Sequence, residues 1–149
     1  MVFESMVDEL IRAASGSTAA IDAVIAELDA VKATLERSMT DGSLYELANS
    51  IQQNLKIQSD RIGGNEKRDL YNDPAEMSVG ARIWHAGFVF PVGANGPTPE
   101  QRESLRLARA LYDDIVSELN TLVNVEYAGL KEAMDTARVP WTPGRGIQP

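Results

Sequence analysis

The first 35 residues carry apolar side chains at steps that alternate strictly between four and three positions. Ser17 is the one polar member of a series formed by Phe3, Val7, Leu10, Ala14, Ser17, Ile21, Val24, Leu28, Val31 and Leu35. Residues spaced in this way share one face of an α-helix. We therefore expect one long helix over about residues 3–38, and so long an apolar stripe requires partner helices to cover it.

A second stripe at similar spacing follows a turn at residues 40–43. It predicts a helix over about residues 44–62, and Gly63-Gly64 supplies its end. The members of this stripe are Leu44, Ala48, Ile51, Leu55, polar Gln58 and Ile62.

Thr98-Pro99-Glu100-Gln101 has the form of a helix start, because Thr98 can cap, Pro99 suits the first helical position and Gln101 completes a capping box. The helix is expected over about residues 98–138. Its apolar register shifts near Leu122, which we interpret as a stutter.

Between these helices, residues 66–96 lose the helical spacing. Asn72-Asp73-Pro74 predicts a turn, and residues 77–85 a short helix. The sequence thus predicts one all-α domain over residues 1–149. This domain is an antiparallel bundle of three long helices plus a short helical or irregular segment.

Composition limits the partners. The formal net charge is −8, and binding to a phosphate backbone requires a concentrated basic face, so we expect no nucleic-acid partner. No apolar run approaches the roughly 18 residues that span a bilayer, so we expect no membrane segment. No basic segment followed by an apolar run opens the sequence, and there are no cysteines. We expect either a free-standing cytoplasmic protein or a domain cut from a longer exported one.

Residues for catalysis are sparse. His85, the single histidine, lacks the Glu-x-x-His spacing of a metal-binding bundle. Neither a phosphate-binding loop nor a G-x-S-x-G motif occurs. We therefore expect no enzyme, no cofactor and no metal. The acidic pairs lie off the apolar register and are expected to face water; they involve Asp8, Glu9, Asp113, Asp114 and Glu118.

Trp84, Phe88, Phe90 and Trp141 are the candidate surface for a partner or ligand, since exposed aromatic rings bind sugars and proteins. Their neighbouring prolines and glycines favour a different interpretation. Large aromatic side chains in such segments usually pack on the core, and we expect these four to be buried.

Several segments of the second half resemble the C-terminal helical region of bacterial sortilin-like proteins with an Asp-box (BNR) β-propeller, often labelled glycosyl hydrolases. The resemblance covers roughly the last 85 residues, and Pro140–Arg145 is its most specific part. It is carried by Asn65-Glu66-Lys67-Arg68, Met77–Ile83, Gly96-Pro97-Thr98, Gln101-Arg102 and Ala137–Arg145.

The resemblance implies a periplasmic or extracellular protein whose ligand site is on the propeller. No Asp-box of the form S-x-D-x-G-x-T-W occurs in this chain, so only the role of a terminal bundle carries over. We expect a non-catalytic accessory or interaction domain that partners the β-propeller or β-sandwich part of its parent. The alternative is a cytoplasmic scaffold that homodimerises through the first stripe, and a helical enzyme using His85 is a third hypothesis.

Overall fold

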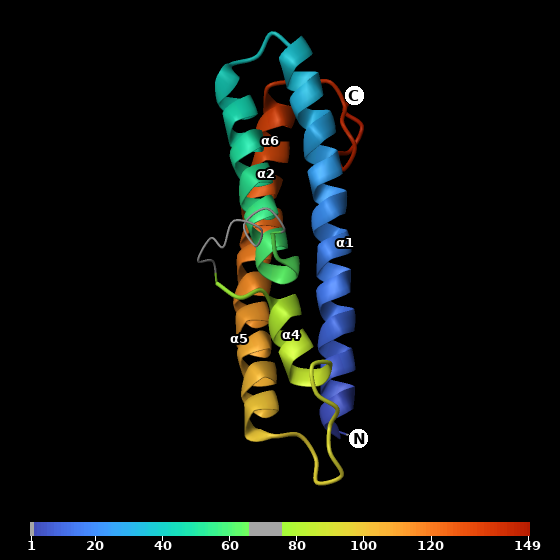
Figure 1. Ribbon diagram of the computed structural model, residues 1–149. Coiled ribbons are helices and arrows are strands. Elements are labelled where there is room, and N and C mark those ends of the chain that lie inside the picture. Colours follow the sequence, from blue (N-terminus) through green and yellow to red (C-terminus); the bar gives the residue numbers. More distant parts are fainter. Residues whose placement is uncertain (1, 66–75) are drawn as a thin grey trace. The chain divides into compact units, whose positions relative to one another are not determined.

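The computed structural model describes residues 2–65 and 76–149, and this part of the chain is helical with connecting loops (Figure 1). The prediction of an all-α helical bundle is confirmed, while the antiparallel order of its helices stays a prediction. The helices are α1 (Val2–Arg37), α2 (Gly42–Gly63), α4 (Val79–Gly87), α5 (Pro99–Thr121), the π-helical segment η1 (Leu122–Tyr127) and α6 (Ala128–Thr136).

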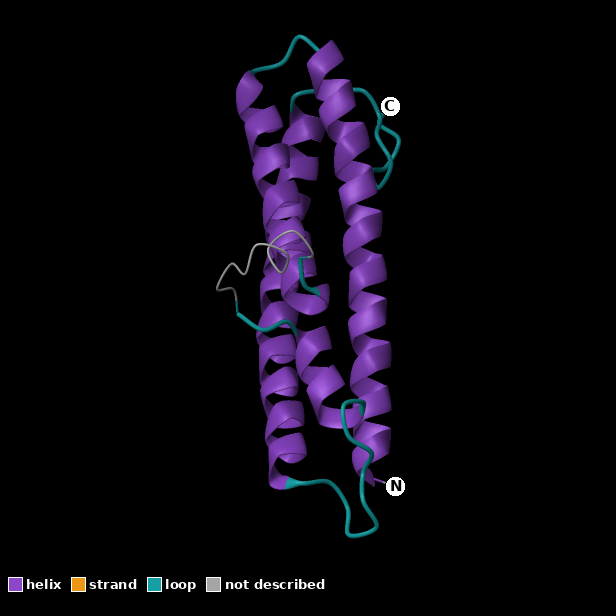
Figure 2. Cartoon of the chain, in the orientation of Figure 1, coloured by secondary structure: helices purple, strands orange, loops and turns teal. Residues whose placement is uncertain are grey.

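Local hydrogen bonds explain where several helices begin. The predicted capping box is confirmed: the Gln101 backbone N–H donates to Thr98 Oγ1 at 3.1 Å, and the Thr98 N–H donates to Gln101 Oε1 at 2.9 Å. Ser78 caps α4 by accepting from the Ala81 N–H at 3.1 Å. The loops between these helices are drawn in Figure 2. The predicted turn at residues 72–74 lies outside the described residues.

The chain from α5 to α6 contains the predicted register shift, but its form is a π-helical turn rather than a stutter. Leu122 and Tyr127, at the two ends of η1, are both buried. They lie five positions apart. In a regular α-helix, successive residues of the buried stripe, or seam, lie three or four positions apart. A π-helix closes i to i+5 hydrogen bonds, so its wider turn takes up the extra residue and keeps both side chains in the core.

The helix α6 ends in a Schellman motif without glycine. The Val139 N–H donates to the Met134 carbonyl at 3.0 Å, and the Arg138 N–H donates to the Asp135 carbonyl at 3.1 Å. Arg138 has a φ of 56°, in the left-handed region. Val139 and Met134 are both buried, so the apolar contact typical of this motif holds a non-glycine residue in that conformation.

The chain divides into two compact units, and the prediction of a single domain stays a prediction. The first unit is Met1–Ala19 with Gln58–Ser117. In it, a carbon added at Gly87 would lie 3.3 Å from Val7 Cγ1, so the end of α4 packs directly on α1. Its core consists of Phe3, Val7, Leu10, Ala14, Ile62, Val79, Ile83, Ala86, Leu105, Ala108, Leu111, Tyr112 and Ile115.

The polar break in the α1 stripe is satisfied within this first unit. The Ser17 hydroxyl lies 2.7 Å from the Tyr112 hydroxyl, and Tyr112 donates to the Ala13 carbonyl at 3.0 Å. The phenol therefore joins α5 to α1 at the one position where the stripe is not apolar.

The second unit is Ala20–Ile57 with Glu118–Pro149. Its buried Gln52 joins α2 to α1, because the side-chain amide donates to Asp29 Oδ1 at 2.7 Å and to the Ile25 carbonyl at 3.1 Å. Lys32 donates to Gln52 Oε1 at 3.1 Å. The apolar core of this unit consists of Ile21, Leu28, Val31, Leu35, Ala48, Ile51, Leu55, Leu122, Tyr127, Leu130, Met134 and Val139.

Deletion of Asn124, which is exposed in η1, tests the explanation of the π-helical turn. The step from Leu122 to Tyr127 becomes four, so the helix can continue with α-helical pitch and keep its seam. We expect the loss of unfolding free energy to stay below about 1 kcal/mol, because no core contact is removed. Thermal unfolding followed by circular dichroism measures it.

The matched control is deletion of Ala23, exposed within α1. This deletion turns all later residues of the helix by about 100° and moves the seam out of the core. We expect it to abolish cooperative unfolding. Equal damage from the two deletions would contradict the role assigned to η1.

Candidate functional site

The aromatic residues singled out from the sequence are exposed, and the prediction of their burial is wrong. Trp84 is 57%, Phe88 52%, Phe90 70% and Trp141 56% exposed. The first three lie within seven positions of the chain, on α4 and the loop that follows it. We call Trp84, Phe88 and Phe90 the aromatic surface.

Helix geometry explains the correction. The buried residues of α4 are Val79, Ile83 and Ala86, at steps of four and three. At about 100° per residue, Trp84 and Phe88 fall on the opposite side of the helix axis. Proximity to glycine and proline favoured burial, but the apolar face of this short helix was already occupied by smaller side chains.

Two rings of the aromatic surface contact each other. The Trp84 and Phe88 ring centroids lie 5.7 Å apart, with planes inclined by 12°. Such offset stacking is a favoured arrangement of aromatic pairs. The two rings therefore form one apolar surface rather than two separate side chains.

The loop beyond the aromatic surface is tied to α5. Gln101, the capping residue, also donates from its side-chain amide to the Phe90 carbonyl at 3.0 Å, and it is 4% exposed. One buried amide thus starts α5 and fixes the backbone that carries Phe90.

His85 lies next to Trp84 and is exposed. No carboxylate within residues 2–65 and 76–149 is hydrogen-bonded to it. In the same ranges, no group of three or more His, Cys, Asp or Glu side chains is placed to hold a metal ion. A general base needs a partner that orients its ring, and the described residues supply none for His85; the enzyme hypothesis based on it stays a prediction.

The predicted solvent-facing acids are exposed. Asp114 pairs with Arg61 at 2.8 Å, and Asp113 with Arg109 at 3.5 Å. Each of these two acids faces water and pairs with an arginine.

Arg145, the last residue of the Pro140–Arg145 motif, is buried and hydrogen-bonded within the C-terminal segment. Its side chain is 1% exposed. Nε and Nη2 donate to Asp135 Oδ1 at 3.1 and 2.8 Å, and Nη2 also donates to the Val139 carbonyl at 3.0 Å. Nη1 donates to the Pro140 carbonyl at 2.7 Å and to Thr142 Oγ1 at 3.4 Å. The guanidinium has five N–H groups, and these bonds use all of them.

Trp141 belongs to this C-terminal structure. Its indole N–H donates to the Arg145 carbonyl at 2.8 Å. One edge of the ring is therefore held by the segment it closes, although much of the ring meets water. This explains its presence without a ligand.

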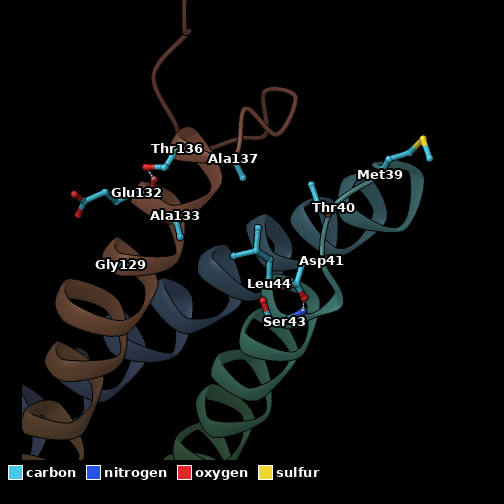
Figure 3. Close-up of a pocket in the computed structure, with 10 residues that line it drawn as sticks. All are labelled: Met39, Thr40, Asp41, Ser43, Leu44, Gly129, Glu132, Ala133, Thr136 and Ala137. Atoms are coloured by element: carbon cyan, nitrogen blue, oxygen red, sulfur yellow. Dashed lines mark hydrogen bonds between the residues drawn. The ribbon is translucent and has the colours of Figure 1, made fainter.

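A hollow of about 660 Å³ lies in the second unit, between the start of α2 and α6 (Figure 3). Figure 3 shows Leu44, Ala133 and Ala137 beside it, while the side chains of Glu132 and Met39 point away. Its lining is divided between such apolar or small residues and polar ones.

The polar groups of this hollow serve the neighbouring helices. Asp41 Oδ1 accepts from the Ser43 N–H at 2.7 Å, and Thr136 Oγ1 donates to the Glu132 carbonyl at 3.1 Å. These groups start α2 and satisfy a carbonyl of α6. Two of its polar side chains are therefore already engaged in local helix contacts.

The chain was compared with family models, curated proteins and solved structures, and none of them matches it. Among the described residues, no helix has both the length and the apolar character needed to cross a bilayer.

Gly144 is the residue of the C-terminal segment least able to change. Its φ is 88°, and a carbon added there would lie 2.6 Å from Glu27 Oε2. We expect Gly144→Ala to lower the unfolding free energy by about 2–3 kcal/mol, from left-handed strain and the collision with the carboxylate. Gly146→Ala is the control, because nothing lies within 4 Å of the added carbon. Urea unfolding measures both, and equal effects would contradict this explanation.

Tyr127 predicts a dependence of stability on alkaline pH. Burial raises the pKa of its phenol above the ordinary value of 10.0, and so does the hydrogen bond of 2.8 Å to Glu27; Arg145 acts in the opposite direction. The folded state therefore keeps a proton that the unfolded state loses. This contribution to stability is complete below pH 10 or so and disappears as the pH rises toward the folded-state pKa.

Urea unfolding between pH 8 and about 11 compares the parent chain with Tyr127→Phe. We expect the parent to lose up to about 1.4 kcal/mol more per pH unit above pH 10, the value for one proton. Lys131, whose Nζ lies 4.6 Å from the Tyr127 ring centroid, is present in both chains. Parallel curves would show that the phenol does not control this loss.

Proposed function

We propose that this chain is a non-catalytic helical interaction domain that binds another protein through the aromatic surface. We further propose that it forms the C-terminal part of a secreted sortilin-like β-propeller protein and docks on the propeller or sandwich of that parent. The observation that carries the proposal is the exposure of Trp84, Phe88 and Phe90, each more than half open to water.

Exposed rings of this size favour a partner. Burial of apolar surface contributes about 25 cal/mol per Å², and tryptophan is among the residues enriched at the energetic centres of protein interfaces. Two further exposed apolar side chains lie near the aromatic surface in the sequence, Met77 at 44% and Val89 at 37%. Exposed apolar side chains are thus concentrated on α4 and the residues next to it, as is typical of a protein interface.

A protein partner fits this surface better than a sugar. Trp84 and Phe88 stack on each other, so one face of each ring is already used. A sugar requires a free ring face together with polar groups for its hydroxyls, whereas the flanking Met77 and Val89 are apolar. An apolar face on the partner satisfies all of these side chains.

The alternative is a homodimer formed through the apolar stripe of α1, and this stripe is buried within the chain. Its apolar side chains are at most 9% exposed at both ends and in the middle of α1; examples are Phe3, Leu10, Ile21, Leu28 and Leu35. They are covered within the chain itself. Their burial favours the docking proposal over a homodimer formed through this stripe.

The test uses the reading frame that encodes this chain. If the frame continues upstream into Asp-box repeats, that β-rich part is produced separately and its affinity for the chain is measured by calorimetry. We expect Trp84→Ala with Phe88→Ala to weaken binding at least tenfold, about 1.4 kcal/mol. Val125→Ala removes an exposed apolar side chain of the other unit and should leave the affinity unchanged.

Three results would overturn the proposal. They are a frame without a β-rich partner, the same affinity in the aromatic double variant, and turnover of a glycan that disappears in His85→Ala. Sedimentation of the chain alone adds a readout, because a stable dimer abolished by the aromatic variant would assign the surface to a second copy instead.

A further inference from the structure

The first unit contains a hollow of about 670 Å³ that the proposed function does not use. It lies between the start of α1, the turn at Gly96-Pro97 and the first half of α5. Its volume is within the range of small-molecule sites, about 300–1,000 Å³. It shares no residue with the aromatic surface, so the two proposals are independent.

The floor of this hollow is apolar. Phe3 and Leu105 are buried beneath it, while Val2 and Met6 are 78% and 49% exposed at its edge. Ala110 adds a small side chain from α5. Two exposed apolar side chains therefore stand beside a buried apolar surface, which suits a hydrocarbon group.

The rim carries positive charge in an otherwise acidic protein. Arg102, Arg106 and Arg109 line the hollow from positions that share one face of α5, and Asp113 is the acid among the lining residues. The whole chain has 14 Lys and Arg against 22 Asp and Glu. With Glu103, which pairs with Arg106, three arginines stand against two acids, and the balance at the hollow is positive.

These arginines are available for a ligand. Arg106 is held by Glu103 through two hydrogen bonds, of 2.8 and 2.6 Å, whereas Arg109 pairs with Asp113 at the longer distance of 3.5 Å; all four side chains are more than half exposed. A long exposed pair such as Arg109–Asp113 contributes about 0–1 kcal/mol, so a ligand carboxylate can replace it. Arg102 is exposed and has no ion-pair partner in the described ranges.

We propose that this hollow binds a small amphiphilic anion, a carboxylate on an unbranched hydrocarbon chain. The carboxylate is held by the arginines of α5, whose planar guanidinium groups match its geometry with two parallel hydrogen bonds. The hydrocarbon chain covers Val2 and Met6. An ion without a hydrocarbon chain leaves the apolar floor in water, and a cationic amphiphile meets like charge at the rim.

Calorimetry with decanoate below its micelle-forming concentration tests the proposal on the full chain. We expect saturable binding of one decanoate per chain. Decyltrimethylammonium has the same hydrocarbon length with the opposite charge, and it should bind at least tenfold more weakly. Absence of saturable decanoate binding, or equal affinity for the two probes, overturns the proposal.

Two variants locate the site. Ala110→Trp fills the hollow from an exposed helical position, and it should abolish decanoate binding. Arg102→Gln with Arg106→Gln removes rim charge and should weaken binding at least tenfold. Lys56→Gln, an exposed change in the other unit, is the control and should bind as the parent does. Unchanged affinity in both rim and hollow variants places the binding elsewhere and overturns the assignment.

Discussion

Burial of the α1 seam is the constraint on which the other elements depend. Helix α1 contributes residues to both compact units, and its seam residues from Phe3 to Leu35 enter both cores. Burying one Val, Leu or Ile side chain contributes about 1.5–3 kcal/mol, so the seam outweighs any single polar contact described here. The other helices are placed by the need to cover it, which is why their own buried residues keep the same three- and four-residue steps.

Polar residues within these seams add specificity. Apolar seams alone tolerate sliding of one helix past another, because many registers bury similar areas. Ser17 with Tyr112 in the first unit, and Gln52 with Asp29 in the second, each allow one register, since a shift would leave a buried polar group without a partner. A buried polar group left unpaired costs about 1–3 kcal/mol.

The spacing of apolar residues was enough to predict much of the fold, but not all of it. Side chains at steps of three and four, together with the Thr98–Gln101 box, were enough to predict long helices and one helix start. The same spacing rule, applied to Val79, Ile83 and Ala86, places Trp84 and Phe88 on the solvent-facing side of α4. The prediction that these rings are buried was wrong because it relied on residue type and not on the helix face. Arg145 was beyond such reasoning, because it is bonded largely to backbone carbonyls and to Asp135, ten positions away. The five-residue step at η1 was visible as a register shift, but its π-helical form depends on keeping both Leu122 and Tyr127 buried.

A side chain can contribute to a binding site only if its hydrogen-bonding groups or apolar surface are not already used within the folded chain. The Pro140–Arg145 segment is the most specific part of the resemblance, yet all five N–H groups of the Arg145 guanidinium donate hydrogen bonds to other residues of this chain. That motif is therefore explained by closure of the C-terminus. The α5 arginines hold only weak surface pairs, and the α4 rings are half open to water. Both of these proposed surfaces belong to the first unit, whereas the buried polar contacts of Gln52 and Arg145 lie in the second.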